Sequence, residues 1–162
     1  MKKYFAPIAL LPALFCVAAY ATTPQETIAA LDDKLAKMGE AKLDGTSKAG
    51  ELTVPTLVFG TRKINNNYDA VDDIKKATGA TATLFVKSGD DFIRVSTNVL
   101  TPEGKRGVGT PLAKAKAYEA VSKGAQYCGV VDVLGTQFDA CYNPIKDKAG
   151  AIIGASYIGY KK

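Results

Sequence analysis

The chain of 162 residues contains no histidine and no tryptophan, and it has only three cysteines. Without histidine, a Ser-His-Asp triad, a Cys-His pair, a His-ligated zinc site and a histidine proton shuttle are all impossible. Catalysis would have to use carboxylates, lysine, tyrosine or cysteine, and no carboxylate pair or activated nucleophile stands out. We therefore expect no enzymatic activity, no cofactor and no metal site.

Long hydrophobic runs are also scarce, and the main one lies at the N-terminus. Lys2 and Lys3 precede an apolar stretch over residues 4–19, and Ala19-Tyr20-Ala21 offers small residues at a signal-peptidase site. An uncleaved membrane anchor is the alternative, but the stretch falls short of about 20 residues and two prolines interrupt it. We predict a signal peptide over residues 1–21 and a single domain over residues 22–162, periplasmic or secreted and without stable membrane insertion.

Residues 22–162 carry only a small excess of positive charge. Removal of residues 1–21 takes two of the 21 basic residues and none of the 16 acidic ones, which leaves a net charge of +3. The lysines are scattered, and a basic patch with interleaved aromatic residues is absent. We expect no nucleic-acid partner.

The first helix is predicted over residues 22–39. Thr23 suits the N-cap, Pro24 the first helical position and Glu26 the third position of a capping box. Its apolar residues recur at helical spacing and form one stripe.

Two further helices follow. One covers residues 68–78 and closes at Gly79, and another begins at Thr110 and Pro111, with Thr110 as its cap, and ends at Gly124. Residues 42–50 are small, polar and glycine-bearing, which predicts a loop.

Strand signals occupy most of the rest. Residues 52–59 are rich in β-formers but contain Pro55, which favours an edge or bulged strand. Three hairpins are predicted after it, over residues 81–86 with 91–99, 126–133 with 136–142, and 144–147 with 151–160. About five antiparallel strands with helices before and between them predict an α+β fold.

An ordered series of motifs resembles the Cache domains of bacterial chemoreceptors and sensor kinases, and more narrowly the Cache 3/Cache 2 fusion type of methyl-accepting chemotaxis proteins. These motifs are GATATLFV at residues 79–86, GDDFIRVST at residues 89–97, Gly109-Thr110, and NPIKD at residues 143–147 followed by Gly150, Ile153 and Gly154. The likeness runs from about Tyr68 to Tyr160.

The resemblance implies a PAS-like antiparallel sheet with a long N-terminal helix on one face and short helices or loops around a small-molecule pocket on the other. It also implies signal transduction and chemotaxis. Cache receptors continue from the last strand into a second membrane helix and an output domain, and this chain stops at Lys162. We therefore expect the signal to pass through a partner, such as a membrane receptor or sensor kinase.

Two cysteines, Cys128 and Cys141, lie in the middle hairpin. If the hairpin turns on Leu134-Gly135, these two residues oppose each other at a non-hydrogen-bonded site, where a cross-strand disulfide fits. A longer or bulged loop is the alternative, because leucine is unusual at the first position of a two-residue turn, and it would shift the pairing.

The candidate ligand-binding residues are Arg94, Ser96, Thr97, Tyr127 and Tyr142. Arg94 interrupts an apolar strand, and a guanidinium within a sheet needs an anion or a polar network for its donors. Its alternative is an exposed position or a pairing with Asp91 or Asp132.

The remaining candidates complete a small site around Arg94. The two tyrosines could line a cavity or simply fill the core, and Ser96 and Thr97 offer neutral hydrogen bonds. The set favours a small carboxylate or a similar anion. The alternative hypothesis is that the chain is a structural or interaction protein of the cell envelope whose pocket is filled by side chains.

Overall fold

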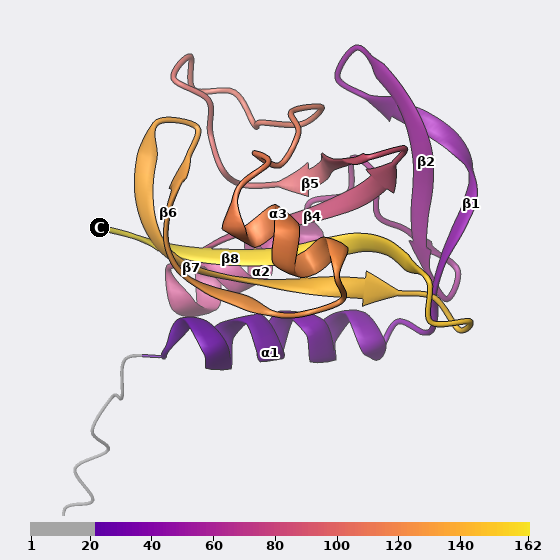
Figure 1. Cartoon of the computed structure of the whole chain (residues 1–162), viewed down its shortest axis with the longest axis horizontal. Coiled ribbons are helices and arrows are strands. Elements are labelled where there is room, and N and C mark those ends of the chain that lie inside the picture. The colour runs from indigo at the N-terminus through magenta and orange to yellow at the C-terminus, as the bar shows by residue number, and fades with distance from the viewer. Residues whose placement is uncertain (1–21) are drawn as a thin grey trace, which may run out of the picture.

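The computed structural model describes residues 22–162, and the predicted signal peptide lies outside the described residues. Figure 1 shows α1 on one side of a five-stranded sheet, α3 on the other side, and a second, three-stranded sheet at one end. Within the described part of the chain, no helix is long and apolar enough to cross a membrane.

Residues 22–162 form three helices and two antiparallel sheets, which confirms the predicted α+β class. The helices are α1 (Pro24–Ala36), α2 (Asp69–Thr78) and α3 (Lys116–Ser122). The small sheet has the order β1-β2-β3, with β1 (Ala41–Ala49), β2 (Leu52–Phe59) and β3 (Arg62–Lys63). The large sheet has the order β5-β4-β8-β7-β6, with β4 (Thr81–Ser88), β5 (Asp91–Thr97), β6 (Tyr127–Val133), β7 (Thr136–Lys146) and β8 (Ile152–Lys161).

The N-terminus of α1 has the predicted capping box. The backbone N–H of Glu26 donates to Thr23 Oγ1 at 3.2 Å, and the backbone N–H of Thr23 donates to Glu26 Oε2 at 2.9 Å. The predicted apolar stripe packs inward, because Ile28, Leu31 and Leu35 are all fully buried. The local cap and the apolar face together place α1 across the sheet.

Two hydrophobic clusters lie on the two faces of the large sheet. The cluster on one face joins α1 and α2 to the sheet, so α2 lies on the α1 side and not on the side of α3. The cluster on the other face joins α3 to the aromatic residues of the sheet. Its buried members are Phe85, Phe92, Val99, Leu112, Ala117, Val121, Val133, Phe138, Ala140, Tyr142, Ala155 and Tyr157.

The loop predicted over residues 42–50 is wrong, because these residues form most of β1, which pairs along β2. Most residues of β1 are exposed, so its sequence has no apolar alternation that would indicate a strand. The register of the pair shifts between Leu43 and Thr46, and Pro55 pairs with Thr46 beside that shift. This irregularity agrees with the bulge that Pro55 predicts.

A second difference concerns β7, which runs on through Pro144 as one strand instead of ending at residue 142. Its neighbour β6 pairs with it only as far as Tyr142, so the chain beyond that residue has one open edge. Pro144 pairs with Ala155 of β8 on the other side. A proline is tolerated there because its missing N–H is not needed at an open edge.

Candidate functional site

Three tyrosines lie side by side on the α3 face of the sheet. Tyr127 of β6 pairs with Tyr142 of β7, and Tyr142 pairs with Tyr157 of β8. The rings of Tyr142 and Tyr157 have their centroids 4.9 Å apart, and both residues are buried, whereas Tyr127 is half-buried. The row carries phenol hydroxyls into an otherwise apolar layer.

A β-bulge in β5 places Arg94 and Thr97 on this same face. The pairing of β5 with β4 skips one residue, Val95, whose side chain joins the cluster on the α1 face. Thr97 Oγ1 lies 2.6 Å from Thr83 Oγ1, and the Arg94 guanidinium lies 5.0 Å from the centre of the Phe85 ring. Four of the five predicted ligand-binding residues, Arg94, Thr97, Tyr127 and Tyr142, therefore share one face.

Ser96 is the exception. Its hydroxyl donates to the backbone carbonyl of Asn67 at 2.6 Å, and Asn67 leads into α2. The bulge turns Ser96 toward the α1 and α2 side, so the structure does not bring it to Arg94.

Arg94 is only 3% exposed. Its Nη1 donates to Thr110 Oγ1 and to the carbonyl of Pro111, both at 2.9 Å, and its buried Nε has no partner among the described residues. The two aspartates considered as partners are engaged elsewhere, since Asp91 pairs with Lys114 at 3.3 Å and Asp132 Oδ1 accepts from the N–H of Gly135. Within residues 22–162, Arg94 has no carboxylate partner.

The site combines a cation with neutral hydroxyls. Burial lowers the pKa of Arg94, and the nearby Tyr142 and Tyr157 act in the opposite direction. Burial raises the pKa of Tyr157 to about 12, and it also raises the pKa of Tyr142 above its usual range. An arginine in this setting stays protonated at physiological pH and both tyrosines stay neutral. Such a group of donors suits an anion.

The helix predicted from Thr110 begins instead at Lys116, so the capping role of Thr110 is wrong. Residues 107–112, here called the flanking segment, run along the outer edge of β5. The backbone N–H of Arg94 donates to the carbonyl of Thr110 at 3.0 Å, and the N–H of Leu112 donates to the carbonyl of Phe92 at 2.8 Å. The side chain of Thr110 bonds with Arg94 and Gly107, which leaves no hydroxyl for a helix cap.

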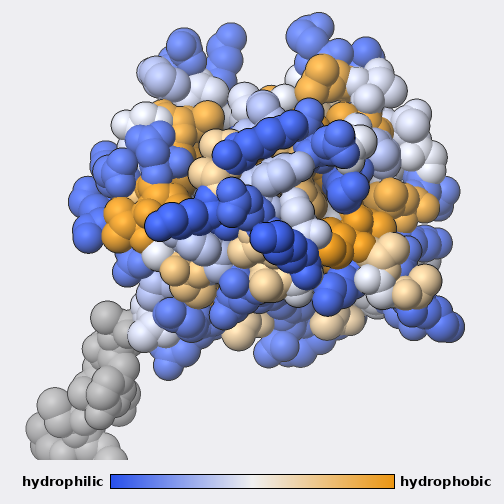
Figure 2. All heavy atoms as spheres, viewed as in Figure 1, coloured by the Kyte–Doolittle hydropathy of each residue, from blue (hydrophilic) through white to orange (hydrophobic). Residues whose placement is uncertain are grey.

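A cavity of about 480 Å³ opens beside the tyrosines, between β6, β7 and the chain that leads into α3. Its lining residues are Leu112, Ala113, Ala115, Lys116, Ala117, Tyr127, Val130, Val131, Asp132 and Tyr142. Figure 2 shows hydrophobic side chains at the surface over β6 and β7 on this side of the molecule, and Val130 of β6 is 50% exposed. Arg94 is not part of the lining, although it lies close enough to Tyr142 for the two groups to interact.

Residues 17–162 match the family model of the Cache 3/Cache 2 fusion domain. The chain belongs to this family. Cache domains are typically extracellular modules that sense small molecules in signalling proteins. A search of the curated proteins finds no match.

The opposite face of this Cache domain holds the predicted disulfide. Cys128 and Cys141 are direct partners in the β6–β7 register and are bonded, with their Cα atoms 4.1 Å apart. The hairpin turns on the two residues predicted, since Leu134 and Gly135 both have positive φ values, 51° and 85°. Among the described residues, no group of three or more acidic or cysteine side chains is placed to hold a metal ion.

Sequence reasoning missed Tyr157, Pro111 and Lys116 in this Cache domain. A register count outward from the predicted turn at residues 148–150 pairs Tyr142 with Ser156. The β7–β8 register shifts between Ile145 and Lys146, which moves every later pair by one and places Tyr157 opposite Tyr142. No local signal announces that the Pro111 carbonyl accepts from Arg94, because that contact joins two distant segments.

Proposed function

We propose that this Cache domain is a periplasmic sensory module that binds a small carboxylate on the α3 face of its large sheet. In this proposal the bound state is reported to a partner protein, such as a membrane receptor or a sensor kinase. The observation that carries the proposal is the Arg94 guanidinium, which is buried with a free Nε and no carboxylate partner within residues 22–162.

A buried guanidinium without a counter-ion is costly, because the desolvation of its charge is not offset by an ion pair. A ligand carboxylate would supply the missing negative charge and accept hydrogen bonds from the planar donor fork of Arg94. The neutral hydroxyl of Tyr142 would add a donor without adding charge.

The neighbouring cavity supports this assignment because it offers an approach to Arg94. Tyr142 lines the cavity and also lies near enough to Arg94 to affect its pKa. In this proposal, a ligand passes from the cavity to Arg94 by displacing Tyr142 or the flanking segment. Because two hydrogen bonds from Arg94 hold the flanking segment, capture of a carboxylate by Arg94 would change the position of that segment. This linkage gives binding a structural consequence that a partner could detect.

The test is a thermal-shift series with acetate, propionate, lactate, succinate and a set of amino acids. A ligand present at about 100 times its dissociation constant stabilises the folded state by about 2.7 kcal/mol, which raises the midpoint of a domain of this size by several degrees. We expect at least one carboxylate to do so, and we expect the Arg94→Gln variant to lose that response. The matched control is Arg62→Gln, since Arg62 is half-exposed and pairs with Asp69 at 3.0 Å far from the site.

An equal shift in wild type and Arg94→Gln would overturn the role of Arg94. A second function, an envelope interaction protein with a filled pocket, is favoured by the near-complete burial of Arg94 and by its absence from the cavity lining. A screen in which no carboxylate raises the midpoint of the wild-type protein would support that second function.

A further inference from the structure

Asp32 of α1 places a largely buried carboxylate on the α1 face of the large sheet. Its Oδ1 accepts from Ser156 Oγ at 2.6 Å, and its Oδ2 accepts from Asn143 Nδ2 at 2.5 Å. Both donors are neutral, and within the described chain no lysine or arginine forms an ion pair with Asp32. Burial raises the pKa of this carboxyl, and the two hydrogen bonds lower it by less.

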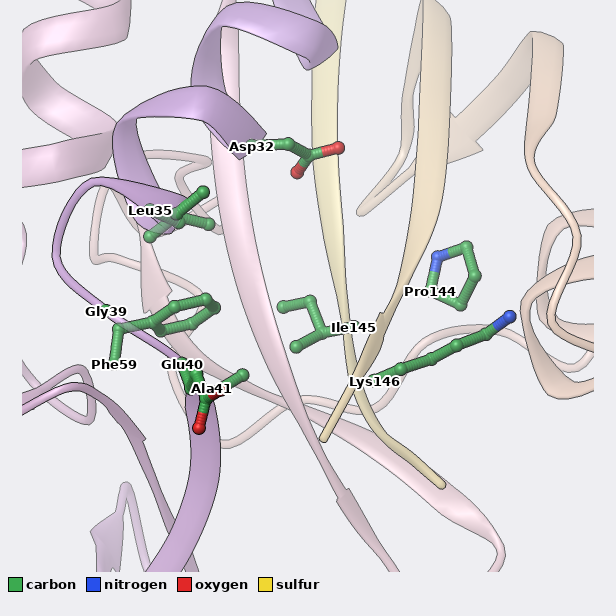
Figure 3. A pocket seen from close by; sticks show the side chains of 10 residues that line it. Asp32, Leu35, Gly39, Glu40, Ala41, Phe59, Pro144, Ile145 and Lys146 are labelled. Carbon is green, nitrogen blue, oxygen red and sulfur yellow. The ribbon is translucent and has the colours of Figure 1, made fainter. Parts of the chain in front are cut away.

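A cavity of about 520 Å³ lies beside Asp32, between the C-terminal end of α1, the small sheet and β7 (Figure 3). Most of its lining is apolar, from the side chains of Leu35, Ala36, Ala41, Phe59, Pro144 and Ile145. The ionisable residues of the lining are Asp32, Glu40 and Lys146. Its size falls in the usual range of small-molecule sites.

Lys146 does not compensate Asp32. Its Nζ lies near Gly124, where it would be 3.2 Å from a Cβ atom placed on that glycine. Figure 3 shows the side chain extending away from Leu35 and Phe59, so only its aliphatic part borders the cavity. Asp32 and an apolar wall therefore border the space, and among the described residues no lysine or arginine forms an ion pair with Asp32.

We propose that this cavity binds an organic cation, namely a primary amine with a short apolar chain. The ammonium group pairs with Asp32, whose two oxygens each retain a free lone pair beyond the bond they already accept. The apolar chain packs against Leu35, Phe59 and Ile145. Binding relieves the cost of a buried carboxylate that has only neutral partners.

This amine site is distinct from the carboxylate site of the proposed function. Asp32 lies on the α1 face and Arg94 on the α3 face, and the two residues have opposite charges. Amine binding therefore does not depend on Arg94, and we expect the Arg94→Gln variant to keep it.

The probe is n-pentylamine, titrated into the purified protein at neutral pH by calorimetry, with 1-pentanol and pentanoate as matched compounds of equal chain length. We expect saturable binding of one pentylamine per chain and at least tenfold weaker binding of the other two. Asp32→Asn should weaken pentylamine at least tenfold, because it removes the charge and keeps the size of the side chain. Asp33→Asn is the control, since Asp33 is the exposed neighbour on the same helix.

A second variant guards against a folding defect in Asp32→Asn. Ala36→Trp changes an exposed residue at the end of α1 that lines the cavity, so it fills the space and leaves Asp32 intact. It should also weaken pentylamine at least tenfold. The proposal is overturned if pentylamine shows no saturable binding, if pentanol binds equally well, or if either folded variant keeps the wild-type affinity.

Discussion

Arg94 and Thr110 are joined by a hydrogen bond of 2.9 Å from the guanidinium Nη1 to the threonine Oγ1. The same hydroxyl donates to the carbonyl of Gly107 at 2.7 Å, so Thr110 uses both its donor and an acceptor position. The pair connects the flanking segment to the buried guanidinium of Arg94 on the α3 face. Ligand binding and the position of the flanking segment are coupled through this contact in the proposed function.

Replacement of Thr110 by valine tests the contact without a change in shape. Thr110→Val leaves one hydrogen bond to Arg94 Nη1, from the Pro111 carbonyl, and removes an acceptor from a buried charge. We expect a loss of about 1–3 kcal/mol in the free energy of unfolding, measured by urea denaturation. Thr61→Val is the control, because Thr61 is exposed in a turn. Equal stabilities of the two variants would contradict the prediction.

Reduction of the Cys128–Cys141 disulfide should destabilise the domain. The bond closes a loop with a sequence separation of 13 residues, and the chain-entropy model gives about 3 kcal/mol for a loop of this length. Urea denaturation of the wild-type protein with and without reductant measures the loss. A variant with alanine at both positions should be insensitive to reductant. If reductant destabilises that variant to the same extent, the effect does not come from this bond.

Asp32 predicts a pH-dependent contribution to stability. Burial raises its pKa above the ordinary value of 3.8, so the folded chain binds this proton more tightly than the unfolded chain does. The stability contribution is fully present below the unfolded pKa, and it is lost as the pH rises through the folded pKa.

Asp32→Asn removes this titration. The variant should therefore gain stability relative to wild type between about pH 4 and about pH 7, measured by urea denaturation at both values. Asp33→Asn should show a smaller change, since Asp33 is exposed. A stability difference between Asp32→Asn and wild type that stays constant or falls with rising pH would be inconsistent with a carboxyl titration raised by burial.

Gly159 of β8 leaves room for Tyr157. A Cβ atom at position 159 would lie 2.2 Å from Tyr157 Oη, so Gly159→Ala forces the ring to move and disturbs its 3.2 Å contact with Thr81 Oγ1. We expect a loss of about 1–3 kcal/mol from this overpacking, measured by thermal or urea denaturation. In a double-mutant cycle, Tyr157→Phe should relieve part of the loss, because it removes the oxygen that is nearest to the new carbon. Strict additivity of the two changes would rule out this contact.

The sequence determined the features that depend on residues close together in the chain. Thr23, Pro24 and Glu26 fix the start of α1 because a cap needs only neighbours within one turn. The β6–β7 register and the disulfide followed from a two-residue turn, since pairing in a hairpin is counted outward from its turn. The α+β class followed from the order of helix and strand signals.

Only the tertiary structure decided which side chains form the site. Regular alternation along β5 would place Arg94 and Ser96 on the same face of the sheet. The bulge at Val95 instead places Thr97 on the face of Arg94 and turns Ser96 to the opposite face. Thr110 has the local features of a helix cap, yet its hydroxyl accepts a hydrogen bond from the guanidinium of Arg94 in β5. No local signal marks Asp32, because its hydrogen-bond partners Asn143 and Ser156 lie more than 100 residues away in the chain. Such contacts join segments far apart in sequence, and they arise when the packed sheet brings those segments together, so no local pattern encodes them.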